Sequence, residues 1–149
     1  MNKKRIFGLI AATMLSVAVL AGCGGSDENA MKDGTYEVEV AKVDEHGYKP
    51  SIKVEVKDGK IATVSYDEIT AEGASKRTDA EYNKKMKEFG KVTNPEEAFP
   101  ALEKAVVEKQ SAEVDAFTGA TTSSENFKKV AAKAIENAKA GNTEKTIME

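Results

Sequence analysis

The 149-residue sequence contains one cysteine, Cys23, and one histidine, His46. A single cysteine excludes an intrachain disulfide, a Cys-x-x-Cys redox pair and a thiolate metal cluster, so redox chemistry would have to come from a bound cofactor. The histidine lies in a polar turn with Gly47 and Pro50, where a solitary imidazole is usually solvated, and we assign it no role. The sequence also has no Gly-x-Gly-x-x-Gly fingerprint of nicotinamide binding.

Long hydrophobic runs are scarce, and the longest covers residues 6–21, after a start that carries Lys3, Lys4 and Arg5. This run is shorter than the roughly 20 residues of a membrane-spanning helix. Small and acidic residues follow it in place of a basic stop-transfer segment. A charged start, an apolar middle and a small-residue end are typical of a secretory signal peptide. We therefore expect residues 1–22 to be a signal peptide and not a membrane span.

The apolar run ends in Leu20-Ala21-Gly22-Cys23. This tetrapeptide resembles the lipobox of bacterial lipoproteins, in which the cysteine thiol receives a diacylglyceryl group and the chain is cut just before it. The resemblance implies that Cys23 becomes a lipidated first residue, anchored in the lipid bilayer at the extracytoplasmic face of the cell membrane. Ordinary secretory cleavage that leaves a free thiol is the alternative. Residues 23–32, mostly small and polar, would form the lipidated tether.

Positive charge becomes scarcer once the leader is removed. The formal charge changes from −3 for the whole chain to −6 for the remaining 127 residues, because the leader holds three cations and no acid. This balance argues against nucleic acid or anionic lipid headgroups as partners. The length fits one domain with its own core. We assign residues 33–141 to that domain and expect residues 142–149 to be a polar tail that frays.

Two segments, residues 36–41 and 52–57, alternate apolar and polar residues with the period of a β-strand, and a third, residues 60–66, is rich in Ile, Val, Thr and Tyr, as strands are. Asp58-Gly59 between the last two is a strong hairpin signal. The simplest arrangement of these segments is a three-strand antiparallel meander. Residues 69–78 show no periodicity and are expected to form a loop.

Three helices are expected after the strands. Asp79 would cap the first, which would end at Gly90 and bury Tyr82, Met86 and Phe89.

The second helix would start at Asn94-Pro95 and run to about Gln110, with Pro100 as a point where it could start late or kink. The third would end at Gly141, and its apolar stripe has steps of three and four: Phe127, Val130, Ala131, Ala134, Ile135 and Ala138. Strands followed by helices indicate an α+β domain.

Residues 115–125, between the second and third helices, carry the chemistry of interest. Gly119 allows backbone conformations closed to other residues, and its small size would let a bulky group approach the main chain. Thr122 and Glu125 have the spacing of a capping box, which would start the last helix directly after Thr121. Thr121 would then lie where unpaired N–H groups and the helix dipole favour an anion such as phosphate. From position alone, a plain capped loop is the alternative.

Within this segment Asp115, Thr118, Gly119, Ala120 and Thr121 match the motif Asp-x-x-Ser/Thr-Gly-Ala-Thr/Ser. Through it the sequence resembles the FMN-binding domain family, which includes a flavin-carrying component of the sodium-pumping NADH:quinone reductase. In that family a dedicated FAD-dependent flavin transferase joins the phosphate of FMN to the hydroxyl of the last motif residue. The resemblance implies covalent FMN on Thr121, with the transferase as a partner.

The resemblance extends over most of the mature chain, through Asp33-Gly34-Thr35-Tyr36, Asp58-Gly59-Lys60-Ile61, Tyr82-Asn83 and Glu108-Lys109-Gln110. These segments are similar to the FMN-carrying lipoproteins of Gram-positive extracellular electron transfer. The similarity implies an electron carrier that is reduced by a membrane quinone or NADH dehydrogenase system and passes electrons to extracellular acceptors. No catalytic acid, base or nucleophile is then required. The alternatives are a flavin-dependent reductase with its own substrate and a non-redox surface lipoprotein.

Four residues in or near the motif have candidate roles beside the flavin. Asp115 could be recognised by the transferase or could order the loop. Phe117 could stack on the flavin ring, although a phenylalanine beside a helix is more often part of the core. Lys76 and Arg77 could stabilise the anionic reduced flavin, or could simply be solvated cations of a polar loop.

Overall fold

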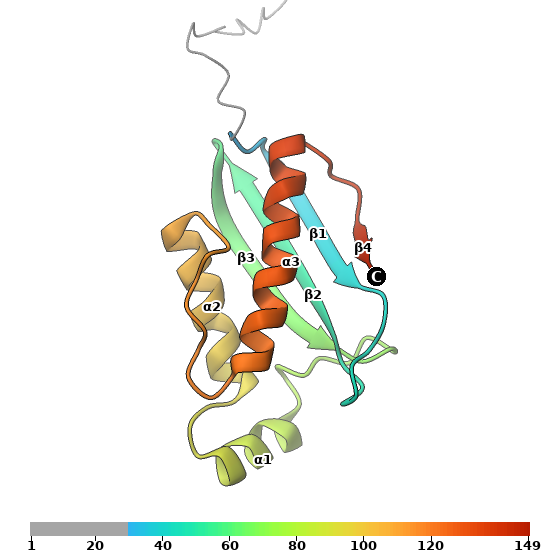
Figure 1. Ribbon diagram of the computed structural model, residues 1–149, viewed down its shortest axis with the longest axis vertical. Helices are drawn as coiled ribbons and strands as arrows, with labels where there is room; N and C mark the ends of the chain where they lie inside the picture. The colour runs from blue at the N-terminus through green and yellow to red at the C-terminus, as the bar shows by residue number, and fades with distance from the viewer. Residues whose placement is uncertain (1–29) are drawn as a thin grey trace, which may run out of the picture.

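The computed structural model describes residues 30–149, so the expected signal peptide, its cleavage site and Cys23 lie outside the described range. One mixed four-stranded sheet, in the order β3 (Lys60–Ile69), β2 (Lys49–Lys57), β1 (Gly34–Val40), β4 (Thr146–Met148), is covered on one face by two helices (Figure 1). A third helix lies beyond one end of the sheet. The α+β class expected from the sequence is confirmed.

The expected meander consists of β1 (Gly34–Val40), β2 (Lys49–Lys57) and β3 (Lys60–Ile69), paired antiparallel in sequence order. The register places Val38 opposite Ile52 and Val54 opposite Val64. Alternation therefore brings most apolar side chains of the three strands to the face that the helices cover, and leaves most charged ones on the other face; Glu68 of β3 is a charged residue on the covered face.

The end of the chain adds a strand that the sequence analysis does not predict. β4 (Thr146–Met148) pairs parallel with β1, so the expectation of a fraying tail is wrong for this segment. The amide of Asn137 donates to the hydroxyl of Thr146 at 2.8 Å, and Lys145 forms an ion pair with Glu39 at 2.6 Å. Three residues are too few to show a strand period, and these long-range contacts leave no local signal in the sequence.

The helices are α1 (Ala80–Gly90), α2 (Pro95–Lys109) and α3 (Thr121–Ala140). The expected caps are confirmed: Asp79 accepts from the amide of Tyr82 at 2.9 Å, and Asn94 accepts from the amide of Glu97 at 3.0 Å. α2 continues through Pro100 to the predicted end.

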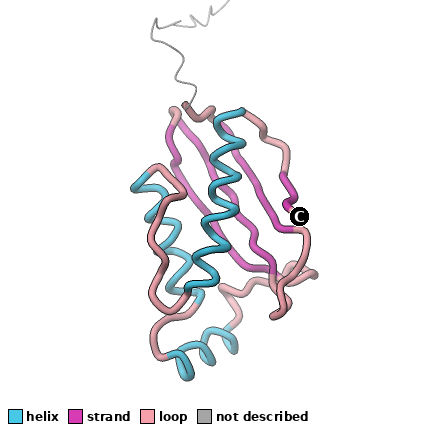
Figure 2. The backbone as a smooth tube through the Cα atoms, viewed as in Figure 1, coloured by secondary structure: helices cyan, strands magenta, loops and turns pink. Residues whose placement is uncertain are grey.

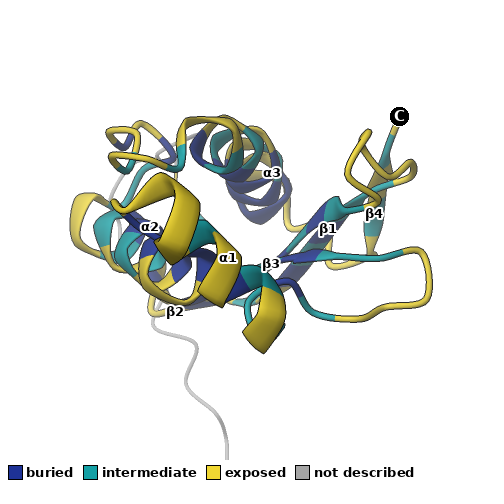
Figure 3. Cartoon of the chain, turned by 90° about the horizontal axis from the view of Figure 1, so that it is seen from below, coloured by how far each residue is buried: buried dark blue, intermediate teal, exposed yellow. Residues whose placement is uncertain are grey.

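The first helix lies beyond the end of the sheet instead of across its face, and Figure 3 shows that most of it is exposed. For this reason the expected burial of Tyr82, Met86 and Phe89 is wrong: the first two are not fully buried and Phe89 is 84% exposed. The one buried residue of α1 is Asn83, whose side-chain amide donates to the carbonyls of Arg77 and Asp79 at 2.8 Å each. These hydrogen bonds hold α1 against the loop that precedes it.

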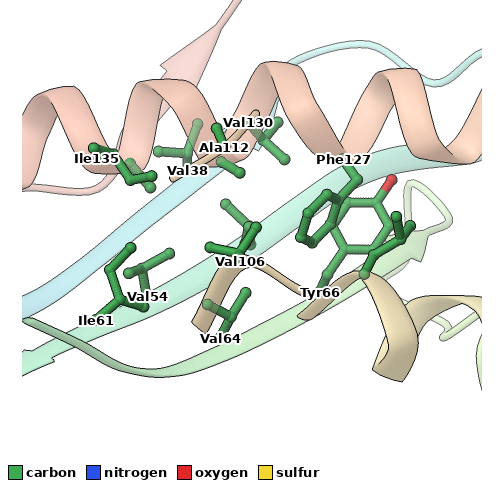
Figure 4. Close-up of a cluster of buried hydrophobic side chains, with 14 of the residues drawn as sticks. Val38, Val54, Ile61, Val64, Tyr66, Val106, Ala112, Phe127, Val130 and Ile135 are labelled. Atoms are coloured by element: carbon green, nitrogen blue, oxygen red, sulfur yellow. The ribbon is translucent and has the colours of Figure 1, made fainter. Parts of the chain in front are cut away.

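The core lies between the sheet and the other two helices, with α2 over β3 and α3 over β1 and β2 (Figure 2). Tyr66 packs edge-on against Phe99 and Phe127, with ring centroids 4.9 and 5.0 Å away, and Figure 4 shows Tyr66 beside Phe127 at one end of the cluster. Such aromatic pairs stabilise a fold by about 0.5–1.5 kcal/mol beyond their buried area. This rigid core fixes the N-terminal end of α3, where Thr121 lies.

Candidate functional site

The last helix begins at Thr121 itself and not after it as expected, and the predicted capping box does not form. Ala120 is the N-cap residue and it has no side-chain cap. Thr122 is therefore already inside the helix. Ser124 instead joins the loop to the helix start, because its buried hydroxyl donates to the carbonyl of Ala120 at 2.7 Å and accepts from the amide of Phe117 at 2.9 Å.

Because no side chain of residues 30–149 caps α3, its first amide groups have no side-chain acceptor. The positive end of the helix dipole lies at the same place and favours an anion there. The side chain of Thr121 is exposed beside these groups. A phosphate on its hydroxyl would lie at the start of the helix.

Gly119 adopts φ +84°, which is closed to most other residues. A Cβ atom at this position would lie 2.9 Å from Cγ1 of Val92 and 3.2 Å from Cγ2 of Thr93. The side chains that approach the main chain of Gly119 are thus those of Val92 and Thr93. Their packing accounts for a glycine here without the expected approach of a ligand. The loop is packed against the segment between α1 and α2.

A hollow of about 170 Å³ opens beside Thr121. It is bounded by the start of α3, the turn after β1, the end of β3 and the inner side of α1. Its walls include Glu68, Lys76, Tyr82, Met86 and the motif residues Gly119, Ala120 and Thr121. The residues that line the hollow come from segments that are far apart in the sequence. His46, which has no role assigned from the sequence, is among them.

Lys76 is not the solvated cation that its polar loop could indicate, because only 5% of it is exposed. Its ammonium lies over the rings of Tyr48 and Tyr82, 4.8 and 4.9 Å from their centroids. It also forms a 2.5 Å ion pair with Glu68. Burial alone would lower the pKa of Lys76, but the hydrogen bond and the negative charge of Glu68 outweigh burial, and the pKa is raised. A fixed positive charge therefore lines the hollow.

Glu68 is a site residue that the sequence analysis misses, and it is 2% exposed. Its carboxylate accepts from the hydroxyl of Tyr66 at 2.9 Å and lies 3.5 Å from the side-chain amide of Asn126. Burial, followed by the charge of Glu68, raises the pKa of Tyr66 well above its ordinary value. The available signal was the strand period, since an acid two residues after Tyr66 continues the buried face of β3.

The remaining candidates lie away from the hollow. Arg77 forms an ion pair with Glu103, and Phe117 is half-buried against the core. The carboxylate of Asp115 is fully exposed, 3.3 Å from the ammonium of Lys109. Thr118 is exposed in the turn before Gly119. The structure thus places Lys76 and Thr121 in the walls of the same hollow and leaves Arg77 outside it.

Neither a metal centre nor a membrane helix is present in the described part of the chain. Among residues 30–149, no three His, Cys, Asp or Glu side chains are placed to hold a metal ion together. None of the three helices described here is long and apolar enough to cross a bilayer.

The profile of the FMN-binding domain family matches residues 46–136, a range that includes the motif and all residues lining the hollow except Asp44. The chain belongs to the FMN-binding domain family. It is also 33% identical over 148 residues to the 15 kDa lipoprotein of Treponema pallidum (strain Nichols), with 99% of each chain covered.

Two solved structures are similar to this FMN-binding domain. A crystal structure of a Clostridium perfringens protein is 48% identical, with a TM-score of 0.76, and the match covers 80% of this chain and 99% of that chain. A solution NMR structure of a Clostridium thermocellum protein is 29% identical, with a TM-score of 0.49, over 72% of this chain and 92% of that chain.

The residues of the hollow fit the parts of FMN. The uncapped start of α3 suits a phosphate, Tyr82 and Met86 offer apolar contact to a flat ring, and Lys76 offers a positive charge. At about 170 Å³ the hollow is smaller than the roughly 300–1,000 Å³ of typical small-molecule sites, so much of a bound FMN would remain exposed.

Proposed function

We propose that this FMN-binding domain is a membrane-anchored extracytoplasmic electron carrier, with FMN joined to Thr121 through a phosphoester. The observation that carries the proposal is the exposed hydroxyl of Thr121 at the uncapped start of α3, in the wall of the hollow that holds Lys76. FMN would supply reversible electron transfer, in which two electrons and one proton are taken up and the reduced ring carries one additional negative charge.

Covalent attachment is supported by the small size of the hollow. A site that encloses only part of a ligand buries little of its surface and holds it weakly. A bond to Thr121 would keep FMN in place outside the cell without a deep pocket. The exposed part of the ring would then be open to electron donors and acceptors.

Attachment requires a transferase that takes FMN from FAD and reaches the hydroxyl of Thr121. Three residues of the motif, Asp115, Thr118 and Thr121, are exposed on the same loop and helix start. Asp115 would serve as a recognition element for this enzyme. Gly119 and Ala120 shape the turn between them. An exposed motif is what a modifying enzyme needs.

The anchor follows from the lipobox at Cys23 and is supported by a relative of nearly equal length that is named a lipoprotein. An anchor at the outer face of the membrane places the flavin within reach of a membrane quinone or NADH dehydrogenase system. Extracellular acceptors would receive the electrons. The chain itself would supply attachment, orientation and tuning.

The flavin-loaded protein in vesicles tests the carrier function. We expect NADH alone to leave the flavin absorbance unchanged, and NADH with membranes that contain an NADH:quinone dehydrogenase to bleach it. Bleaching by NADH without any membrane would favour a self-contained reductase instead. A colourless protein from cells that hold an active transferase would favour a non-redox lipoprotein.

A further inference from the structure

The ammonium of Lys76 is held in one position by contacts on several sides. Its backbone amide donates to the carbonyl of Glu68 at 2.9 Å, and its side chain pairs with the carboxylate of the same residue. The rings of Tyr48 and Tyr82 pack edge-on with centroids 5.7 Å apart, and both lie under the cation. A cation fixed in this way acts as a constant source of electric field on the hollow.

The sign of that field depends on how the charge of Glu68 is offset. The hydroxyl of Tyr66 donates to one of its oxygens, and the amide of Asn126 lies 3.5 Å from the same oxygen, while Lys76 takes the other. Donor dipoles on the buried side therefore offset part of the negative charge. The ammonium has three N–H donors, and Glu68 uses one. A positive contribution toward the hollow remains.

We propose that Lys76 tunes the flavin: its buried charge stabilises the negative charge gained on reduction and raises the reduction potential of the group on Thr121. Charge placed near the ring is one of the main ways in which a protein sets flavin electronics. The inference rests on the proposed function, since it needs FMN on Thr121. It distinguishes Lys76 from its neighbour Arg77, whose charge is paired with Glu103 outside the hollow.

The test uses the full chain, flavinylated by a purified FAD-dependent transferase and titrated by spectroelectrochemistry. Lys76→Met removes the charge at similar length, and we expect the midpoint potential to become more negative. Arg77→Met is the matched control, with an adjacent cation removed, and its potential should equal that of the wild type. A Lys76→Met potential equal to the wild type would overturn the proposal.

Lys76→Met alone leaves Glu68 buried without its partner, which could disturb the fold or add a negative charge of its own. The double variant Lys76→Met/Glu68→Gln removes both charges, and the negative shift should persist in reduced size. Lys76→Arg keeps a cation and should return the potential toward the wild-type value. Wild-type potential in the double variant, or a Lys76→Met shift that Lys76→Arg leaves unchanged, would overturn the tuning role.

Measuring the mass of the peptide that contains Thr121 distinguishes failure of the tuning role of Lys76 from failure of the proposed attachment of FMN. A wild-type chain without added flavin mass would overturn both. Attached flavin with an unshifted potential in Lys76→Met would overturn only the role of Lys76. Lost attachment in Lys76→Met would assign the residue to the transfer reaction and would also overturn its tuning role.

Discussion

Gly119 has a role that no larger residue can take without a cost to the stability of the loop before Thr121. Two separate restrictions act on it: its φ of +84°, and Val92, which would lie only 2.9 Å from a Cβ atom at this position. Left-handed backbone costs an L-residue about 1–2 kcal/mol. Contact with Val92 adds a second cost that depends on how far the neighbouring loop can shift.

We predict that Gly119→Ala lowers the free energy of unfolding by about 1–2 kcal/mol or more, measured by urea denaturation. Gly73→Ala is the matched control, because Gly73 has nearly the same φ, +87°, but no atom within 4 Å of its Cβ position. The difference between the two variants isolates the clash. Equal losses would show that Val92 does not restrict the loop.

The sequence predicts those features of the site that depend on neighbouring residues in the chain, and not those that depend on long-range contacts. A helix start near Thr121 is predicted from the residues around it, although the capping box on which its exact position is based does not form. The buried pair of Lys76 and Glu68 is not predicted, since it depends on the register of β3 and on rings contributed by Tyr48 and Tyr82. These four residues are brought together only by the folded chain, and a cation in a polar loop looks the same in the sequence whether it is buried or solvated.

At the level of elements, periodicity and residue composition predict the strands β1 to β3 and the stripe of α3, because each is long enough to show its pattern. They fail for β4, which has three residues, and for the burial of α1, which depends on where the helix lies. Glu39 connects β4 to the rest of the sheet, since its carboxylate contacts Lys145 at 2.6 Å and Lys49 at 2.5 Å.

These contacts make the stability from Glu39 depend on pH. Hydrogen bonds from Lys145 and Lys49 lower the pKa of Glu39 below its ordinary value of 4.5. Its contribution is therefore fully present above pH 4.5 and is lost as the pH falls through the lowered value. In urea denaturation, Glu39→Gln should be less stable than the wild type at pH 7, and this difference should shrink below pH 4.5.

Glu37→Gln serves as the control, because its ion pair with Lys53 is more exposed, with 40% of the Glu37 side chain accessible. Exposed pairs contribute little, so this variant should resemble the wild type at every pH. A Glu39→Gln deficit that stays constant from pH 7 to pH 3 would contradict the assigned role of these ion pairs.

In the whole molecule, the proposed flavin site and the start of the described chain lie at opposite ends of α3, as Figure 1 shows. Lys32 donates from its amide to the carbonyl of Ala138 at 2.9 Å, near the C-terminal end of this helix, whereas Thr121 begins it. Twenty residues of helix span about 30 Å. An anchor at Cys23 would therefore hold the domain by the end opposite the flavin. This separation comes from tertiary packing, and the sequence alone does not predict it.

Covalent attachment of FMN to Thr121 is tested most directly by in-gel fluorescence after denaturing electrophoresis, followed by peptide mass mapping. The wild type, Thr121→Ala and Thr122→Ala are each produced with an active flavin transferase. Thr122 makes no cap in the structure, so Thr122→Ala should change stability by no more than about 0.5 kcal/mol. Thr122→Ala is the control for removal of a threonine hydroxyl next to Thr121.

We predict fluorescent bands for the wild type and Thr122→Ala, with the mass of one FMN less one water on the peptide that contains Thr121. Thr121→Ala should give a dark band and an unchanged unfolding midpoint. A fluorescent Thr121→Ala band would place the attachment elsewhere. A dark wild-type band, from cells shown to flavinylate another protein, would contradict covalent flavin on this chain.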